Sequence, residues 1–182
     1  MKLIDQKIRK NIYNYILQCI LATGILLSAL LFLNALTETA LIASLGATSF
    51  IVFAMPKTYA SSPRRLIGGY SIGIIIGIIC SYLGSVLHDT SLLNALIPQE
   101  SPIVFAAIAV GISIFIMTIT NTEHAPAAGV ALGLVINQWS LKSILFIVVV
   151  MLIMAIIRHL LYPYLINLTS PTFQETTETK SR

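Results

Sequence analysis

Four stretches of the chain are apolar over roughly the 20 residues that an α-helix needs to cross a bilayer. They are residues 12–36, 66–87, 102–120 and 143–164. Only 10% of the 182 residues are charged, against about 25% in an average soluble domain. In lipid, a helix satisfies its own backbone polar groups, which is why such segments span as helices. The sequence therefore predicts an all-α integral membrane protein with four full-length transmembrane helices.

Two shorter apolar stretches, residues 41–55 and 125–137, lie between the long ones. At 1.5 Å per residue they are roughly 22 and 20 Å long, less than the ~30 Å hydrocarbon core. The order long–short–long thus occurs twice, over residues 12–87 and 102–164. Paired short segments in corresponding halves are typical of a transporter's substrate site. We therefore predict two short or broken membrane helices in two three-helix repeats.

The basic residues distinguish six crossings from four. With six crossings and a cytoplasmic N-terminus, the outer side holds only Lys142. With four, Lys57, Arg64 and Arg65 would move outside, against the positive-inside rule. Six crossings place both termini in the cytoplasm and make the second triplet an inverted repeat of the first. The cytoplasmic side then collects Lys2, Lys7, Arg9, Lys10, Lys57, Arg64, Arg65, Arg158, Lys180 and Arg182.

Composition limits the other possibilities. Residues 1–166 are predicted to form one transmembrane domain, and the tail 167–182, rich in Thr, Ser and Glu, is predicted to be disordered. The net charge of +4 fits membrane orientation, so no nucleic-acid partner is expected. Cys19 and Cys80 both fall in apolar helices and predict neither a disulfide nor a metal site. A multi-pass protein of the plasma membrane is the expected setting.

The starts of the two short segments form the candidate substrate site. A helix N-terminus carries free N–H groups and partial positive charge, and so binds anions. Two such starts, approaching from opposite faces, would meet at the bilayer midplane. The alternative is that both are plain short helices in which Gly and Pro serve packing. The first start contributes Gly46, Ala47, Thr48 and Ser49. The second contributes His124, Ala125, Pro126, Ala127 and Gly129.

Charged neighbours extend this site toward the cytoplasm. Glu123 and His124 are adjacent, and ionisable groups near the membrane are usually functional. His124 titrates near neutral pH and is a candidate for proton coupling. Arg64 and Arg65 are expected at the cytoplasmic mouth with Glu123, where they would concentrate anions. The alternatives are an interfacial cap for Glu123 and contact with lipid phosphates for the arginines.

The third helix carries small residues four apart, at Gly69, Gly73, Gly77 and Ser81. This spacing allows close approach of a neighbouring helix backbone, so a packing role is predicted. Tyr70 is expected as an anchor near the membrane interface, with a deeper position as the alternative. The chain shows no nucleophile elbow, phosphate-binding loop or metal-spaced His/Cys set. We therefore expect no enzymatic activity, metal or cofactor.

Two blocks of sequence resemble the HPP family of integral membrane proteins. Its first signature block is similar to residues 46–49, followed by Phe53, Pro56, residues 62–64 and residues 67–69. Residues 124–132 resemble the His-Pro-Pro-Ala-Gly-Ala block that names the family, with Ala125 in place of the first proline and Ala128 inserted before the glycine. The resemblance implies a small helical membrane protein, described with four spanning helices. Plant plastid and cyanobacterial members are associated with nitrite transport.

The leading functional hypothesis is transport of a small inorganic monovalent anion, with nitrite as the named substrate on the strength of the resemblance. The alternative is a non-transporting membrane scaffold or regulatory subunit that packs against partner helices. A homodimer is expected, because so small a bundle is short of helices to enclose a wet path. The expected partners are the small anion, the lipid bilayer and a second copy of the chain.

Overall fold

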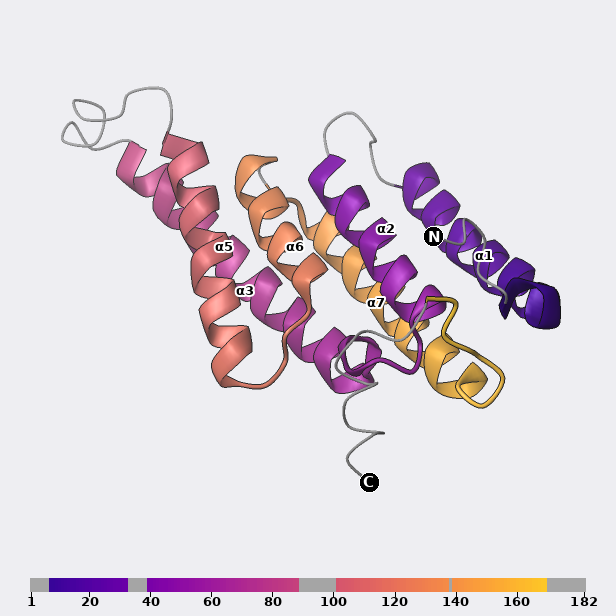
Figure 1. The fold of residues 1–182 in the computed structure, drawn as a ribbon. Coiled ribbons are helices and arrows are strands. Elements are labelled where there is room, and N and C mark those ends of the chain that lie inside the picture. Colours follow the sequence, from indigo (N-terminus) through magenta and orange to yellow (C-terminus); the bar gives the residue numbers. More distant parts are fainter. Residues whose placement is uncertain (1–6, 33–38, 89–100, 138, 170–182) are drawn as a thin grey trace, which may run out of the picture.

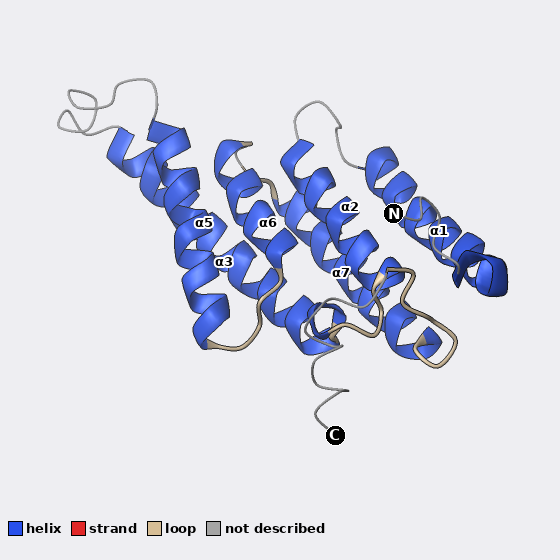
Figure 2. Cartoon of the chain, viewed as in Figure 1, coloured by secondary structure: helices blue, strands red, loops and turns tan. Residues whose placement is uncertain are grey.

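A computed structural model of the protein describes residues 7–32, 39–88, 101–137 and 139–169, and every regular element in these ranges is a helix (Figure 2). This confirms the all-helical prediction. A single 3-10 turn, η1, occupies Tyr59–Ser61 between the second and third helices. The α-helices are α1 Lys7–Phe32, α2 Thr39–Ala54, α3 Pro63–His88, α5 Ser101–Ile119, α6 Ala125–Ile136 and α7 Leu141–Leu161.

Four of these helices, α1, α3, α5 and α7, are long and apolar enough to cross a membrane, while α2 and α6 are shorter apolar helices. The predicted division into long and short helices is confirmed. The last helix ends at Leu161, three residues before the predicted boundary, because Pro163 lacks the N–H needed to continue it. The amides of Tyr164 and Leu165 both donate to the Leu161 carbonyl in the closing turn. Residues 33–36 of the predicted first span lie outside the described residues.

Successive helices alternate in direction across the bundle (Figure 1). The ends of α2, α5 and α7 therefore lie at the same end of the bundle as the starts of α3 and α6. Arg65 and Arg158 lie at this end, and Lys142 lies in the first turn of α7 at the opposite end. Alternation is the arrangement that six crossings require, whereas the symmetry of an inverted repeat stays a prediction. Lys2, Lys180 and Arg182 lie outside the described residues.

Helices α3 and α6 pack at backbone distance through the predicted small-residue ladder. A Cβ placed on Gly69 would lie 2.7 Å from the His124 Cβ, and one on Gly77 would lie 3.0 Å from the Ala131 Cα. Between them, a Cβ on Gly73 would overlap the Ala127 carbonyl. Glycine is required here because real Cβ atoms do not approach neighbouring backbone so closely. The predicted packing role is confirmed for the three glycines of the ladder.

The two short helices lie side by side and antiparallel, which corrects the predicted meeting of their N-termini. Gly129 of α6 packs against Ser44, and Gly133 packs against Leu41 near the start of α2. The start of α2 therefore lies beside the C-terminal half of α6. The apolar run before residue 43 is itself helical, so α2 begins at Thr39. Residues 46–49 thus lie inside the helix, with no free helix-start amides.

A C-terminal segment after α7 closes one end of the bundle. The Leu168 amide donates to the Ala54 carbonyl at 2.8 Å, and the Lys57 amide donates to Asn167 Oδ1 at 2.9 Å. Gln18 of α1, which is fully buried, donates to the carbonyls of Phe53 and Ile166. The last carbonyls of α2 are satisfied in this way. The first residues of the predicted tail are therefore part of the fold, while residues 170–182 lie outside the described residues.

We expect Gly73→Ala to destabilise the protein by about 1–3 kcal/mol, because the new methyl group overlaps the backbone of α6. Gly111→Ala on α5 is the matched control, since nothing described lies within 4 Å of its Cβ position. That change is expected to be neutral or to stabilise by up to about 1 kcal/mol through helix propensity. Thermal unfolding in detergent measures both. Equal stability of the two variants would contradict the close α3–α6 contact.

Candidate functional site

Three buried polar side chains from α2, α3 and the start of α6 form a hydrogen-bonded cluster, here called the relay: Thr48, Tyr70 and His124. Thr48 Oγ1 lies 2.8 Å from the Tyr70 hydroxyl and 3.0 Å from His124 Nε2. His124 Nδ1 lies 3.3 Å from the Ala60 carbonyl, which can only accept. In the neutral imidazole, Nδ1 therefore donates to the Ala60 carbonyl and Nε2 accepts from the Thr48 hydroxyl, which in turn accepts from Tyr70.

The local sequence explains how this histidine enters the bundle. His124 is the N-cap of α6, with extended backbone at φ −139° and ψ 95°. Pro126 follows in the first helical turn, where a missing N–H costs nothing. Gly69 leaves the space into which the His124 side chain packs, and Tyr70 is the next residue of α3. The Tyr70 and His124 rings lie 5.6 Å apart between centroids.

A second cluster, here called the latch, lies at the same end of the bundle and consists of Tyr59, Arg65, Asn121 and Glu123. Arg65 Nη1 donates to the Glu123 carboxylate, and Arg65 Nη2 donates to Asn121 Oδ1. The Tyr59 hydroxyl also donates to Asn121, and its ring stacks under the Arg65 guanidinium. Asn121 has φ 56°, a left-handed conformation that Asn tolerates better than most residues. It turns the chain between α5 and α6.

The loop between α2 and α3 joins the relay to the latch. Tyr59 belongs to the latch, and the next residue, Ala60, accepts the hydrogen bond from His124. Ser61 is fully buried and donates to the Pro56 carbonyl at 2.6 Å. Arg158, near the end of α7, donates to the same carbonyl at 2.8 Å. The loop therefore covers the relay and is fixed from two sides.

The predicted site residues divide into those near the relay and those used elsewhere. Gly46 packs against Leu26 of α1, and Ala47 is exposed. The Ser49 hydroxyl donates to the Leu45 carbonyl within α2. Ala127 and Gly129 provide the contacts of α6 with α3 and α2, Pro126 is buried, and Ala125 is exposed. Among the described residues of the predicted substrate set, only Thr48 and His124 hydrogen-bond to each other through their side chains.

The residues predicted at the cytoplasmic mouth also differ in their burial and their partners. Arg65 is buried and pairs with Glu123, whereas Arg64 is exposed and reaches the Thr120 carbonyl at 3.5 Å. Tyr70, expected as an interfacial anchor, is fully buried because its hydroxyl finds Thr48 inside the bundle. Tyr59 and Asn121 were not predicted. The polar residues just before His124 could have identified Asn121 as a site residue. Nothing in the sequence around Tyr59 identifies it in the same way.

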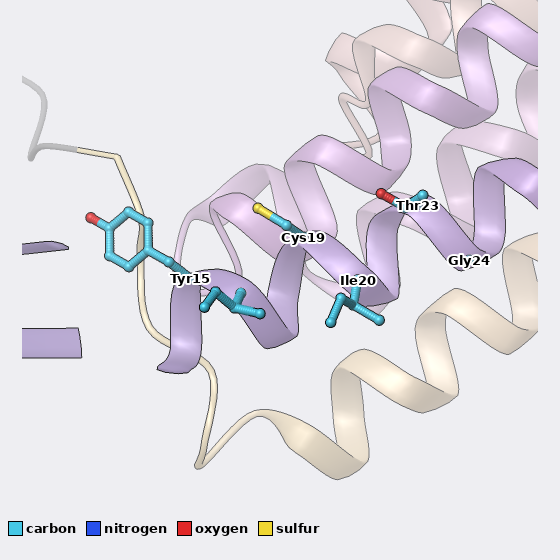
Figure 3. Close-up of a pocket in the computed structure, with 6 residues that line it drawn as sticks. Tyr15, Cys19, Ile20, Thr23 and Gly24 are labelled. Carbon is cyan, nitrogen blue, oxygen red and sulfur yellow. The ribbon is translucent and has the colours of Figure 1, made fainter. Parts of the chain in front are cut away.

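An open hollow lies on the surface of α1, apart from both clusters (Figure 3). None of the relay or latch residues lines it. Its walls are largely apolar, so it suits lipid or another helix better than an ion. The hollow is lined by Tyr15, Ile16, Cys19, Ile20, Thr23 and Gly24.

The alternating apolar helices around a buried polar cluster define a multi-pass helical membrane protein. A profile of the family described as "HPP, transmembrane region" matches residues 8–172. The chain therefore belongs to the HPP family, as the two sequence blocks indicated.

A curated relative supports the membrane assignment. The chain is similar to a transmembrane protein of Dictyostelium discoideum, with 32% identity over 114 residues. The match covers 60% of this chain and 36% of that protein, so it spans little more than a third of the relative's length. No solved structure matches the chain.

Thr48→Val is expected to destabilise the protein by about 1–3 kcal/mol for each partner left unsatisfied, namely the Tyr70 hydroxyl and His124 Nε2. Thr118→Val on α5 is the control, because that exposed hydroxyl bonds only to the Ile114 carbonyl one turn earlier. We expect it to change stability by less than about 0.5 kcal/mol. Thermal unfolding of both variants in the same detergent tests this, and equal shifts would argue against the relay.

Proposed function

We propose that the protein transports a small inorganic monovalent anion across the membrane, with nitrite as the named substrate. The observation that carries this proposal is the relay of Thr48, Tyr70 and His124, buried between apolar helices. Arg65 is bonded to Glu123, the residue before His124. Polar groups at such depth are expensive and usually mark an ion or proton pathway. Membership of the HPP family supports transport as the class, and the choice of nitrite rests on the resemblance to its plastid and cyanobacterial members.

The chemistry of the relay suits a weakly basic anion. Its two hydroxyls can turn their protons toward a bound anion, and its imidazole can accept or release one proton. Lys57, Arg64 and Arg65 add positive charge at the same end of the bundle, which raises the local anion concentration. With six crossings this end faces the cytoplasm of a plasma-membrane protein. The anion then passes between α2, α3 and α6, rather than between two facing helix starts.

Purified protein in liposomes is expected to take up nitrite faster than empty vesicles. Nitrite entry is followed by colorimetric assay of the vesicle contents, with and without an imposed pH gradient. Stimulation by an inward proton gradient would support a role for the imidazole in coupling. Flux equal to that of empty vesicles under both conditions would refute the proposed function.

His124→Ala is expected to reduce nitrite flux at least tenfold, because it removes the titratable group and both of its hydrogen bonds. His159→Ala is the matched control, since that imidazole is exposed in the last turn of α7. The flux of the control is expected to stay within twofold of the unchanged protein. Elution as a single peak in size-exclusion chromatography checks folding. Full flux from folded His124→Ala protein would remove the imidazole from the mechanism.

A second candidate function is a membrane scaffold or regulatory subunit. It is favoured by Gly24 on α1 and Gly111 on α5, because nothing described lies within 4 Å of either Cβ position. Such open glycines let a partner helix approach closely. This function predicts stable co-purification with a second membrane protein and no nitrite flux. The liposome experiment therefore separates the two candidates.

A further inference from the structure

We propose that Arg65 binds small anions that carry two oxygens on one atom, such as nitrite or formate, in exchange for the Glu123 carboxylate. This deepens the proposed function and rests on it, because it names the recognition residue and the class of anion. The carboxylate of Glu123 then acts as a tethered substitute for the substrate. It occupies the arginine when no anion is bound.

The exposure of the two partners supports exchange. The side chain of Arg65 is 4% exposed, whereas that of Glu123 is 45% exposed. The guanidinium is fixed from several sides, by Tyr59 under its face and by Asn121 on Nη2. Glu123 lies in the short connection before α6, and only its carboxylate completes the contact. The buried cation therefore stays in place while the anionic partner can leave to solvent.

The position of Arg65 makes an anionic partner necessary. It lies in the first helical turn of α3, which contains no acidic residue. The partial positive charge of a helix start disfavours a cation there unless an anion is close. Glu123 supplies that anion from a different segment of the chain. When the carboxylate leaves, a solute anion takes its place at the arginine and balances both the guanidinium and the helix start.

The geometry selects a class of anion. A guanidinium presents N–H donors in one plane that match the two oxygens of a carboxylate. In the structure, Arg65 Nη1 donates to one oxygen of Glu123 and Nη2 donates to Asn121. Because each of these nitrogens carries two N–H groups, the pair keeps a donor for each oxygen of an incoming anion. Nitrite and formate share the bent, planar arrangement of two oxygens found in the Glu123 carboxylate. Chloride offers a single centre and no second acceptor. Arg65 is therefore expected to prefer nitrite and formate over chloride.

Exchange of the Glu123 carboxylate for an anion at Arg65 also affects the relay. Glu123 is the residue before His124, the N-cap of α6. Tyr59, on the face of Arg65, is the residue before Ala60, which accepts from His124. An anion that releases Glu123 therefore loosens the segment that leads into His124, while Tyr59 stays on the guanidinium. Binding at the latch thereby opens the way to the relay.

Isothermal titration calorimetry on the full chain in detergent, with sodium nitrite, sodium formate and sodium chloride as probes, tests this proposal. Nitrite and formate are expected to bind at least tenfold more tightly than chloride. Glu123→Gln is expected to tighten nitrite binding by about tenfold, because the competing carboxylate is gone. Arg65→Lys, which keeps the charge and loses the planar donors, is expected to weaken it by more than tenfold.

Two controls separate specific recognition from general electrostatics. Lys142→Gln removes a charge at the other end of the bundle and is expected to leave the dissociation constant within twofold. Arg64→Gln removes an exposed neighbouring charge and is expected to weaken binding less than threefold. Equal binding of chloride, equal losses at Arg64 and Arg65, or weaker binding by Glu123→Gln would each overturn the proposal. If Arg65→Lys fails to fold, Glu123→Gln decides alone.

The binding and flux measurements distinguish a failure of the Arg65 site from a failure of the proposed transport function. Selective binding that depends on Arg65, without flux in liposomes, would refute transport and retain this site. Nitrite flux that is the same in the unchanged protein, Glu123→Gln and Arg65→Lys would retain transport and refute this site.

Discussion

The close approach of α6 to α3 is the constraint on which the rest of the structure depends. Gly69, Gly73 and Gly77 remove the side chains that would hold the two backbones apart. In lipid, where helix association gains little from the hydrophobic effect, such packing is a main source of stability. The same contact positions His124 against α3 and so determines where the polar cluster forms. Packing and site are therefore built by one set of glycines.

Two clusters of polar side chains in this bundle find their partners within the protein. A hydrogen bond that water would replace outside must be made inside, since an unsatisfied group in hydrocarbon is costly. The relay meets this demand as a chain in which Tyr70, Thr48 and His124 satisfy one another and end on a backbone carbonyl. The latch meets it with an ion pair near the bundle end, where Glu123 still contacts solvent. The buried relay and the partly exposed latch thus satisfy their polar groups in different ways.

Much of the fold was predictable because it depends on local composition. Apolar length identified the four long helices and the two short ones, and the spacing of Gly69, Gly73 and Gly77 predicted a packed face. The structure brings together only part of the predicted substrate set. Thr48 and His124 were identified, but Gly46 and Ala47 face elsewhere, and the start of α2 lies away from the start of α6. The polar residues Thr37, Glu38 and Thr39, which precede the apolar run, were the available signal for the earlier start of α2.

The sequence by itself determined that the protein lies in a lipid bilayer. It also determined the number and length of its helices and which polar residues they carry. These follow from apolar length and charge distribution, which are properties of single segments. Only the tertiary structure decided that Tyr70 turns inward, that Arg65 meets Glu123, and that Ala60 closes over His124. Each of these contacts joins residues from separate helices or loops. Their distance is set by how the backbones pack, and no single segment encodes it.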